Sequence, residues 1–211
     1  MLYFKLILAL LAGYLLGSVN FSIIISNALG ENIKSKGSGN AGLTNMLRVF
    51  GPKPAVIVLI GDVLKAAAAC LLGYLLTANE LNSHHLFDVD SPNLGLMLAG
   101  TSCIIGHLFP AYFHFKGGKG VLTTAIVVLM IDWRIGVSLL CVFVIIALIT
   151  KIVSVSSMVA AICLPIANAI LEKPGYSMVY AVAIMLLILV MHRQNIGRLI
   201  KGTEPKLKMG N

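Results

Sequence analysis

The sequence predicts an all-α protein, a polytopic bundle of transmembrane helices. Composition is the first observation: 58% of the 211 residues are apolar, 11% are charged, and the mean hydropathy is +0.95. Soluble domains carry about 25% charged residues, so a soluble protein is excluded. Long apolar runs and an uneven distribution of positive charge are the other two observations. The chain shows no internal repeat and no linker, and residues 1–211 are therefore expected to form a single membrane domain.

Seven apolar runs account for the predicted spans. Six of them are 16 residues or longer, and they cover 2–29, 54–78, 94–115, 135–150, 152–171 and 176–191. About 17–25 residues are needed to cross the hydrocarbon core of a bilayer, so these six are expected to be transmembrane helices. The seventh run, 121–131, is short. It spans only if it begins in the glycine-rich turn before it or if the membrane is locally thin.

Positive charge predicts the orientation of the spans. The connections 30–53, 116–120 and 192–211, together with position 151, contain twelve of the 16 Lys and Arg residues. The opposite connections contain three, and the largest of them, 79–93, has Glu80, Asp88 and Asp90 but no Lys or Arg. We therefore expect an outside N-terminus and a cytoplasmic C-terminus. That arrangement needs an odd number of crossings, so the short run counts as a seventh span.

The net charge of +8 follows from these cytoplasmic connections, and binding of nucleic acid is a poor explanation of it. Attraction to anionic lipid headgroups is an alternative role for the lysines of the C-terminal tail.

The stretch KGSGNAGLTNMLR, residues 36–48, has the G-x-G-x-x-G spacing of dinucleotide-binding loops. That motif has a physical meaning only between a strand and a helix. Here an apolar span precedes it, and Asp62, where the acidic partner should stand, lies inside the second span. What remains is a loop whose glycines and polar donors could approach a phosphate closely. A flexible polar loop is the alternative. The candidate phosphate-binding residues are Gly37, Ser38, Gly39, Asn40, Thr44, Asn45 and Arg48.

A second glycine-rich stretch, GHLFPAYFHFKGGKGV, covers residues 106–121. It is not a P-loop, because Phe113 stands at the position of the first glycine and no Ser or Thr follows Lys119. We predict a second anion-binding loop. The alternative, a positively charged anchor at the membrane edge, explains Lys116 better than Lys119. His107, inside the preceding span, is expected to be a packed or hydrogen-bonded histidine. The candidate ligands of the anion are Gly117, Gly118, Lys119 and Gly120.

The third polar stretch is MHRQNIGRLIKGTE, residues 191–204. His192, Asn195 and Arg198 are three residues apart and would share one side if the last span continues as a helix. A histidine there could position or deprotonate a hydroxyl, although a solvated interfacial histidine is equally consistent with the pattern. Three such loops on one membrane face predict a ligand with more than one phosphate, or two phosphorylated substrates. No metal site is predicted, because no cluster has metal-ligand spacing.

Asp62 and Lys65 are three residues apart inside the second span. Pairing across one helical face lowers the cost of burying either charge, so a structural ion pair is expected. A proton path is the alternative, and it is weakened because no other span carries an acid well inside it.

The three motifs, in this order and spacing, resemble those of the bacterial acyl-phosphate:glycerol-3-phosphate acyltransferases. The stretches GSGNAGLTNMLR, GHLFPAYFHFKGGKGV and HRQNIGRLIKGTE carry the resemblance, GDVLKA adds to it, and together they cover nearly the whole chain. The departures from the family pattern leave the polar donors intact; they are Leu43, Leu122, Met191 and Gln194.

The resemblance implies transfer of a fatty acyl group from acyl phosphate to the 1-hydroxyl of glycerol 3-phosphate, the first step of phospholipid synthesis. It implies catalytic or substrate-binding roles for Ser38, Arg48, Lys119, His192 and Asn195. Substrate binding by Ser157 and an organising role for Glu204 are further implications. The proton acceptor stays open between His192 and the leaving phosphate.

The resemblance also implies a multi-pass protein of the bacterial inner membrane with its active site at the cytoplasmic face. The acyl chain of the substrate would lie between helices, in a space open to lipid. It implies no cofactor and no obligate protein partner. A transporter or channel for phosphorylated small molecules is the alternative function, but such a protein needs access from both faces and the outer connections lack matching donors. Acyltransferases with a His-x-x-x-x-Asp pair are disfavoured, because Gly197 and Tyr112 occupy the Asp position after His192 and His107.

Overall fold

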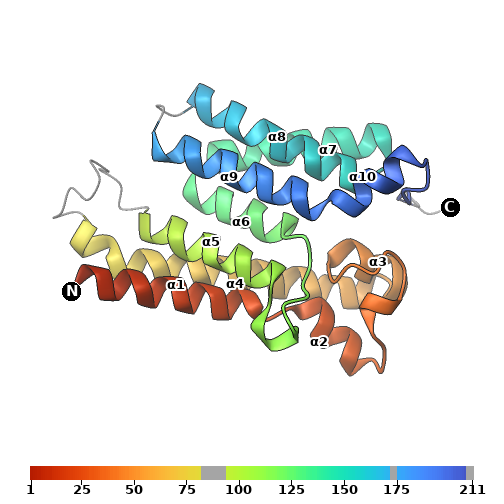
Figure 1. Ribbon diagram of the computed structural model, residues 1–211, viewed down its shortest axis with the longest axis horizontal. Helices are drawn as coiled ribbons and strands as arrows, with labels where there is room; N and C mark the ends of the chain where they lie inside the picture. The colour runs from red at the N-terminus through yellow and green to blue at the C-terminus, as the bar shows by residue number, and fades with distance from the viewer. Residues whose placement is uncertain (82–93, 172–174, 208–211) are drawn as a thin grey trace. The chain divides into compact units, whose positions relative to one another are not determined.

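The computed structural model describes residues 1–81, 94–171 and 175–207, and every regular element within these ranges is helical (Figure 1). The predicted all-α class is confirmed. Parts of the expected outer and C-terminal charge pattern lie outside the described residues, namely Asp88, Asp90, Lys173 and Lys208. The helices are α1 (Leu2–Ser18), α2 (Phe21–Ala28), α3 (Leu43–Phe50), α4 (Pro52–Leu81), α5 (Leu94–Leu108), α6 (Val121–Ile131), α7 (Trp133–Thr150), α8 (Val153–Leu171), α9 (Tyr176–Met191) and α10 (Arg193–Ile200), with short 3₁₀ turns at Ile33–Ser35 and Ala111–Phe113.

The chain forms two compact units, Met1–Ile131 and Asp132–Asn211. In the first unit α1, α4 and α5 pack side by side, and α6 packs against α4 and α5 (Figure 1). Glycines allow the close contact of α1 with α5. A Cβ atom added at Gly13 would lie 2.3 Å from the carbonyl oxygen of Ala99, and one added at Gly17 would lie 2.1 Å from that of Cys103. Small residues at such contacts let membrane helices approach each other through their backbones.

In the second unit α7, α8 and α9 pack in succession. The last apolar helix does not continue straight into the third motif, because the axes of Ser177–Met191 and Arg193–Ile200 differ by 56°. The chain after α10 returns to the turn between α7 and α8, where the Leu207 amide donates to the Lys151 carbonyl oxygen at 2.7 Å.

Five helical segments in the described ranges are long and apolar enough to cross a membrane, or six if the bent α9–α10 pair is one span. Each apolar run of the sequence therefore contains the predicted helix, but in the run 94–115 helix α5 ends at Leu108. At 11 residues, α6 is only about 16 Å long, against a hydrocarbon core of about 30 Å. Seven crossings and the orientation of the termini stay predictions.

The first span is interrupted, which the sequence analysis did not predict. The candidate span Leu2–Ala28 contains two helices, and Val19 and Asn20 between them are extended. Asn20 caps the second helix, since its Oδ1 accepts a hydrogen bond of 3.1 Å from the Ile23 amide.

Candidate functional site

The first glycine loop has a backbone that requires glycine. Gly37 and Gly39 have φ values of +57° and +71°, in the left-handed region that side chains rarely adopt. A Cβ atom at Gly37 would also lie 2.3 Å from Asn45 Oδ1. The Gly39 amide donates to the Lys36 carbonyl oxygen at 3.0 Å and so closes the turn. These two glycines therefore shape the loop.

Asn45 lies at the centre of this loop and is buried. Its Oδ1 accepts a hydrogen bond of 2.9 Å from the Ser38 amide. Its Nδ2 donates to three loop carbonyl oxygens at 3.0–3.2 Å, those of Ile33, Lys36 and Asn40. We predicted Asn45 as a phosphate-binding donor. In the structure both polar atoms of its side chain are used within the loop, so its observed role is to organise the loop, and direct phosphate binding by Asn45 stays a prediction.

Other predicted donors of the loop are accessible. Ser38, Asn40 and Thr44 are half-buried, and Arg48 on α3 is exposed. Gly42 is the N-cap of α3 and has no side chain to accept hydrogen bonds from the first-turn amides. These amides, including that of Thr44, point out of the helix end, where an anion can bind.

The second glycine loop packs tightly on the end of α5. The Gly117 and Gly118 amides donate to the carbonyl oxygens of Leu108 and His107 at 3.0 and 3.1 Å. These two amides satisfy carbonyl oxygens of the last turn of the helix, and the predicted phosphate binding at Gly117 and Gly118 stays a prediction. A Cβ atom at Gly117 would lie 2.0 Å from the His107 carbonyl oxygen. Gly120, with φ +75°, then turns the chain into α6, and Lys119 beside it is half-buried.

The two glycine loops lie against each other within the first unit. A Cβ atom at Gly118 would lie 2.5 Å from the carbonyl oxygen of Ala41 in the first loop. The Lys34 ammonium donates to the backbone carbonyl oxygen of Lys116, which joins the loops a second time. Burial of Lys34 and the nearby charge of Lys116 lower the pKa of Lys34. Two stretches about 80 residues apart in the chain therefore form one polar surface. The sequence motifs did not predict this contact.

In the second unit, His192 occupies the bend between α9 and α10 and is buried. Its Nδ1 lies 2.8 Å from the carbonyl oxygen of Ile188. A carbonyl oxygen only accepts hydrogen bonds, so Nδ1 carries the hydrogen and the lone pair of the neutral ring is on Nε2. The bend separates His192 from the continuous helical face that its spacing from Asn195 suggested.

Glu204 connects three segments of the second unit. Its Oε1 accepts hydrogen bonds from Asn195 Nδ2 at 2.5 Å and from Ser154 Oγ at 2.7 Å. Its Oε2 accepts a hydrogen bond of 2.7 Å from Arg198 Nε. Burial acts to raise the pKa of this carboxyl, but the three hydrogen bonds and the Arg198 charge outweigh burial and hold the pKa below its usual 4.5. This geometry agrees with the organising role expected for Glu204.

A protein family and several known proteins match nearly the whole chain. The family model described as glycerol-3-phosphate acyltransferase matches residues 7–202. The chain is 43% identical over 208 residues to the glycerol-3-phosphate acyltransferase of Shouchella clausii, covering 96% of each chain. It is 36% identical over 204 residues to that of Coxiella burnetii, covering 96% of this chain and 98% of the relative. The chain belongs to the glycerol-3-phosphate acyltransferase family.

Solved structures of this acyltransferase family agree with the fold. The crystal structure of PlsY (YgiH), an integral membrane glycerol 3-phosphate acyltransferase, in its glycerol 3-phosphate form, has a TM-score of 0.82 and 32% identity over 96% of this chain and 95% of that one. The lysophosphatidic acid form of PlsY gives a TM-score of 0.78 and 31% identity, with the same coverage. The resemblance based on the three motifs is confirmed, and with it the class of the protein, a multi-pass membrane acyltransferase.

The structure of this acyltransferase adds a residue that sequence reasoning missed. Ser157 was the predicted serine of the α8 region, but it is buried and its hydroxyl donates to the Val153 carbonyl oxygen at 2.8 Å. Ser154, one helical turn earlier, is the serine that bonds Glu204. The repeated serines of VSVSS could have indicated either position, because both lie on the same side of the helix.

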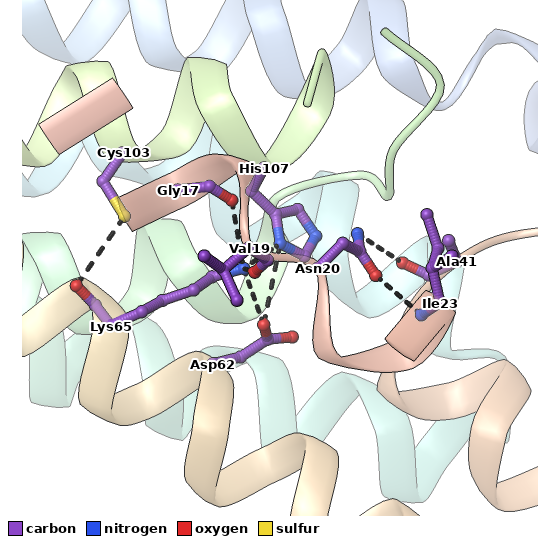
Figure 2. A network of polar contacts seen from close by, with 9 residues as sticks. All are labelled: Gly17, Val19, Asn20, Ile23, Ala41, Asp62, Lys65, Cys103 and His107. Atoms are coloured by element: carbon purple, nitrogen blue, oxygen red, sulfur yellow. Dashed lines mark hydrogen bonds and ion pairs between the residues drawn. The ribbon is translucent and has the colours of Figure 1, made fainter. Parts of the chain in front are cut away.

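The predicted ion pair in the second span of the acyltransferase is confirmed. Lys65 Nζ lies 2.7 Å from Asp62 Oδ1, and both side chains are buried. His107 is hydrogen-bonded, as expected: its Nδ1 lies 2.9 Å from Lys65 Nζ (Figure 2).

Proposed function

We propose that the protein transfers a fatty acyl group from acyl phosphate to the 1-hydroxyl of glycerol 3-phosphate, giving lysophosphatidic acid and inorganic phosphate. One observation carries the proposal beyond family membership: the contact of two glycine loops, one bearing Ser38 and the other Lys119. Arg48 follows the first loop on α3. Together these residues supply a hydroxyl donor and two cations to a ligand rich in phosphate oxygens.

An acyl phosphate is a mixed anhydride with a good leaving group. The glycerol 3-phosphate hydroxyl oxygen forms a bond to the acyl carbonyl carbon, the bond from that carbon to the phosphate oxygen breaks, and the hydroxyl proton leaves. No covalent enzyme intermediate is needed. Orientation of the two substrates and stabilisation of developing negative charge can supply much of the rate.

Each candidate residue has a chemical role in this proposal. Lys119 and Arg48 bind phosphate groups, and Arg48 can make a two-pronged contact. The Ser38 hydroxyl donates to a substrate oxygen. His192 takes the hydroxyl proton on Nε2, because the hydrogen bond to Ile188 keeps the other ring nitrogen protonated. Asn195 orients the third motif through Glu204.

The leaving phosphate is the alternative proton acceptor, and removing His192 distinguishes the two. We further propose that these residues act at the cytoplasmic face of the bacterial inner membrane, as the distribution of Lys and Arg indicates.

Labelling of single cysteines tests that orientation. Ser38→Cys and Lys116→Cys should react with a membrane-impermeant maleimide only from the cytoplasmic side. Gly118 is unsuitable as a labelling position, because a side chain there would collide with His107 and Ala41. Reaction of both cysteines from outside would overturn the proposed orientation.

Product formation tests the reaction itself. Purified protein in detergent should convert labelled glycerol 3-phosphate and acyl phosphate to lysophosphatidic acid, and Lys119→Gln should reduce the rate strongly. Uptake of labelled glycerol 3-phosphate into proteoliposomes without any acylated product would instead favour a transporter.

A further inference from the structure

The interruption of the first span carries an inference about how the glycine loops are positioned. The extended residues 19–20 leave carbonyl oxygens at the end of α1 without helical partners. Lys65, from the middle of α4, provides the missing donor. Its Nζ donates to the carbonyl oxygens of Val19 at 2.7 Å and Gly17 at 3.3 Å (Figure 2).

The remaining contacts of the Lys65 ammonium use its full donor capacity. An ammonium has three hydrogens and no acceptor. Two hydrogens go to Val19 and Gly17, and the third goes to His107 Nδ1 at 2.9 Å. Asp62 Oδ1 lies 2.7 Å away as an ion pair without the direction of a hydrogen bond, and it neutralises the buried charge. His107 must accept at Nδ1, so the neutral ring carries its hydrogen on Nε2.

His107 links this cluster to both loops. A Cβ atom at Gly118 would lie 2.4 Å from His107 Nε2 and 2.5 Å from the Ala41 carbonyl oxygen. The second loop thus packs between the imidazole and the backbone of the first loop. The His107 carbonyl oxygen also accepts the Gly118 amide. Movement of the ring would therefore disturb the packing of the second loop at Gly118.

The interrupted segment reaches the loops by a second route. The Ser18 hydroxyl oxygen accepts the Ala111 amide at 3.3 Å, and the Tyr14 hydroxyl donates to the Phe109 carbonyl oxygen at 2.8 Å, so α1 is tied to the start of the second loop. Asn20 Nδ2 donates to Ala41 in the first loop at 3.5 Å.

We infer that Lys65 is a positioning residue for the phosphate-binding loops: its ammonium fixes the α1 interruption and His107, and through them the spacing of the two loops. This rests on the proposed function for the nature of the ligand. Loops that are already held at the competent spacing can bind the substrate phosphate without first having to rearrange. If only a fraction of molecules has the competent spacing, the apparent affinity falls by that fraction, while the rate at saturation is little changed.

The test is the double variant Asp62→Asn, Lys65→Met, which removes the ammonium without leaving a buried unpaired carboxylate. We expect the KM for glycerol 3-phosphate to rise at least about tenfold with kcat within about threefold of wild type. Hydrogen exchange of the Gly117 and Gly118 amides should accelerate as well. Thr77→Val is the matched control, because Thr77 is a buried residue of α4 whose hydroxyl donates to the Gly73 carbonyl oxygen of its own helix.

A second variant avoids buried charge altogether. Tyr14→Phe, Ser18→Ala removes the two contacts from α1 to the second loop, and it should shift the KM for glycerol 3-phosphate and the hydrogen exchange of the loop amides in the same direction. This variant is the test to use if the Lys65 variant fails to fold. Unchanged KM and unchanged loop exchange in a folded variant would overturn the inference, and so would a loss confined to kcat. If the wild type transfers no acyl group, the proposed function fails, but exchange of the loop amides still tests the positioning role.

Discussion

Arg198 Nε donates a hydrogen bond of 2.7 Å to Glu204 Oε2, and this contact ties the chain after α10 back onto that helix. Asn195 and Ser154 bond the other carboxylate oxygen. Glu204 therefore fixes α10, which bears the candidate catalytic residue Asn195, and the negative charge of Glu204 strengthens its contact with Arg198.

The first prediction follows from the lowered pKa of Glu204. A carboxyl whose folded-state pKa lies below its usual 4.5 stabilises the fold above that pH and loses this contribution as the pH falls through the folded value. Glu204→Gln should lower the melting temperature in detergent at pH 7, and the difference from wild type should shrink below pH 4.5. The control is Glu31→Gln, which removes an exposed ion pair with Lys36 and should change little. A difference that stays constant on acidification would contradict the account.

The second prediction separates the two lysines of KGGKG. Lys119→Gln should reduce kcat/KM at least about tenfold, because a charge-assisted hydrogen bond to a phosphate is worth roughly 1.5–3 kcal/mol. Lys116→Gln should do much less, since Lys116 is exposed and its known structural contact is through its backbone carbonyl oxygen, which the substitution keeps. Equal and mild losses, in protein that is folded and inserted, would mean that this loop is only a charged turn.

The third prediction concerns the amide of Asn45. Asn45→Asp keeps the shape of the side chain but turns Nδ2, a donor to three carbonyl oxygens, into an oxygen that repels them. We expect activity to fall at least about tenfold, with a loss as large as that of Asn45→Ala, because a buried group left without partners costs about 1–3 kcal/mol. Initial rates and melting temperatures of both variants measure this. An Asp variant close to wild type would show that Asn45 does not organise the loop.

The fourth prediction addresses the proton. His192→Asn can place an amide donor near the Ile188 carbonyl oxygen but removes the Nε2 lone pair. Loss of a general base typically costs about 10²–10⁴ in rate, so kcat should fall by at least about a hundredfold while the melting temperature is kept. A folded variant with nearly full activity would assign the proton to the leaving phosphate instead.

The sequence predicted the helical class, the apolar runs and the chemical character of the three motifs, because these depend on local composition and spacing. It predicted the pairing of Asp62 with Lys65 for the same reason, since both lie on one helix. It did not predict that Lys65 caps the end of α1 or that Gly118 packs on Ala41. Such contacts join residues far apart in the chain, and no local pattern encodes them.

The same limit applies to the contacts of Asn45, Gly117 and Gly118. Their residue types suit phosphate binding, but the fold uses their polar groups for its own hydrogen bonds. A glycine that lets a ligand approach and a glycine that lets a helix end approach have the same appearance in a sequence. The two are separated only by the neighbouring atoms in space.

The most direct measurement of the central claim compares acyl donors. Purified protein in detergent is given labelled glycerol 3-phosphate with either acyl phosphate or acyl-CoA of the same chain length, and lysophosphatidic acid and inorganic phosphate are quantified together. We predict product only with acyl phosphate, with one phosphate released for each lysophosphatidic acid formed. Product formation from acyl-CoA at a comparable rate, or acyl transfer without stoichiometric release of phosphate, would contradict the account.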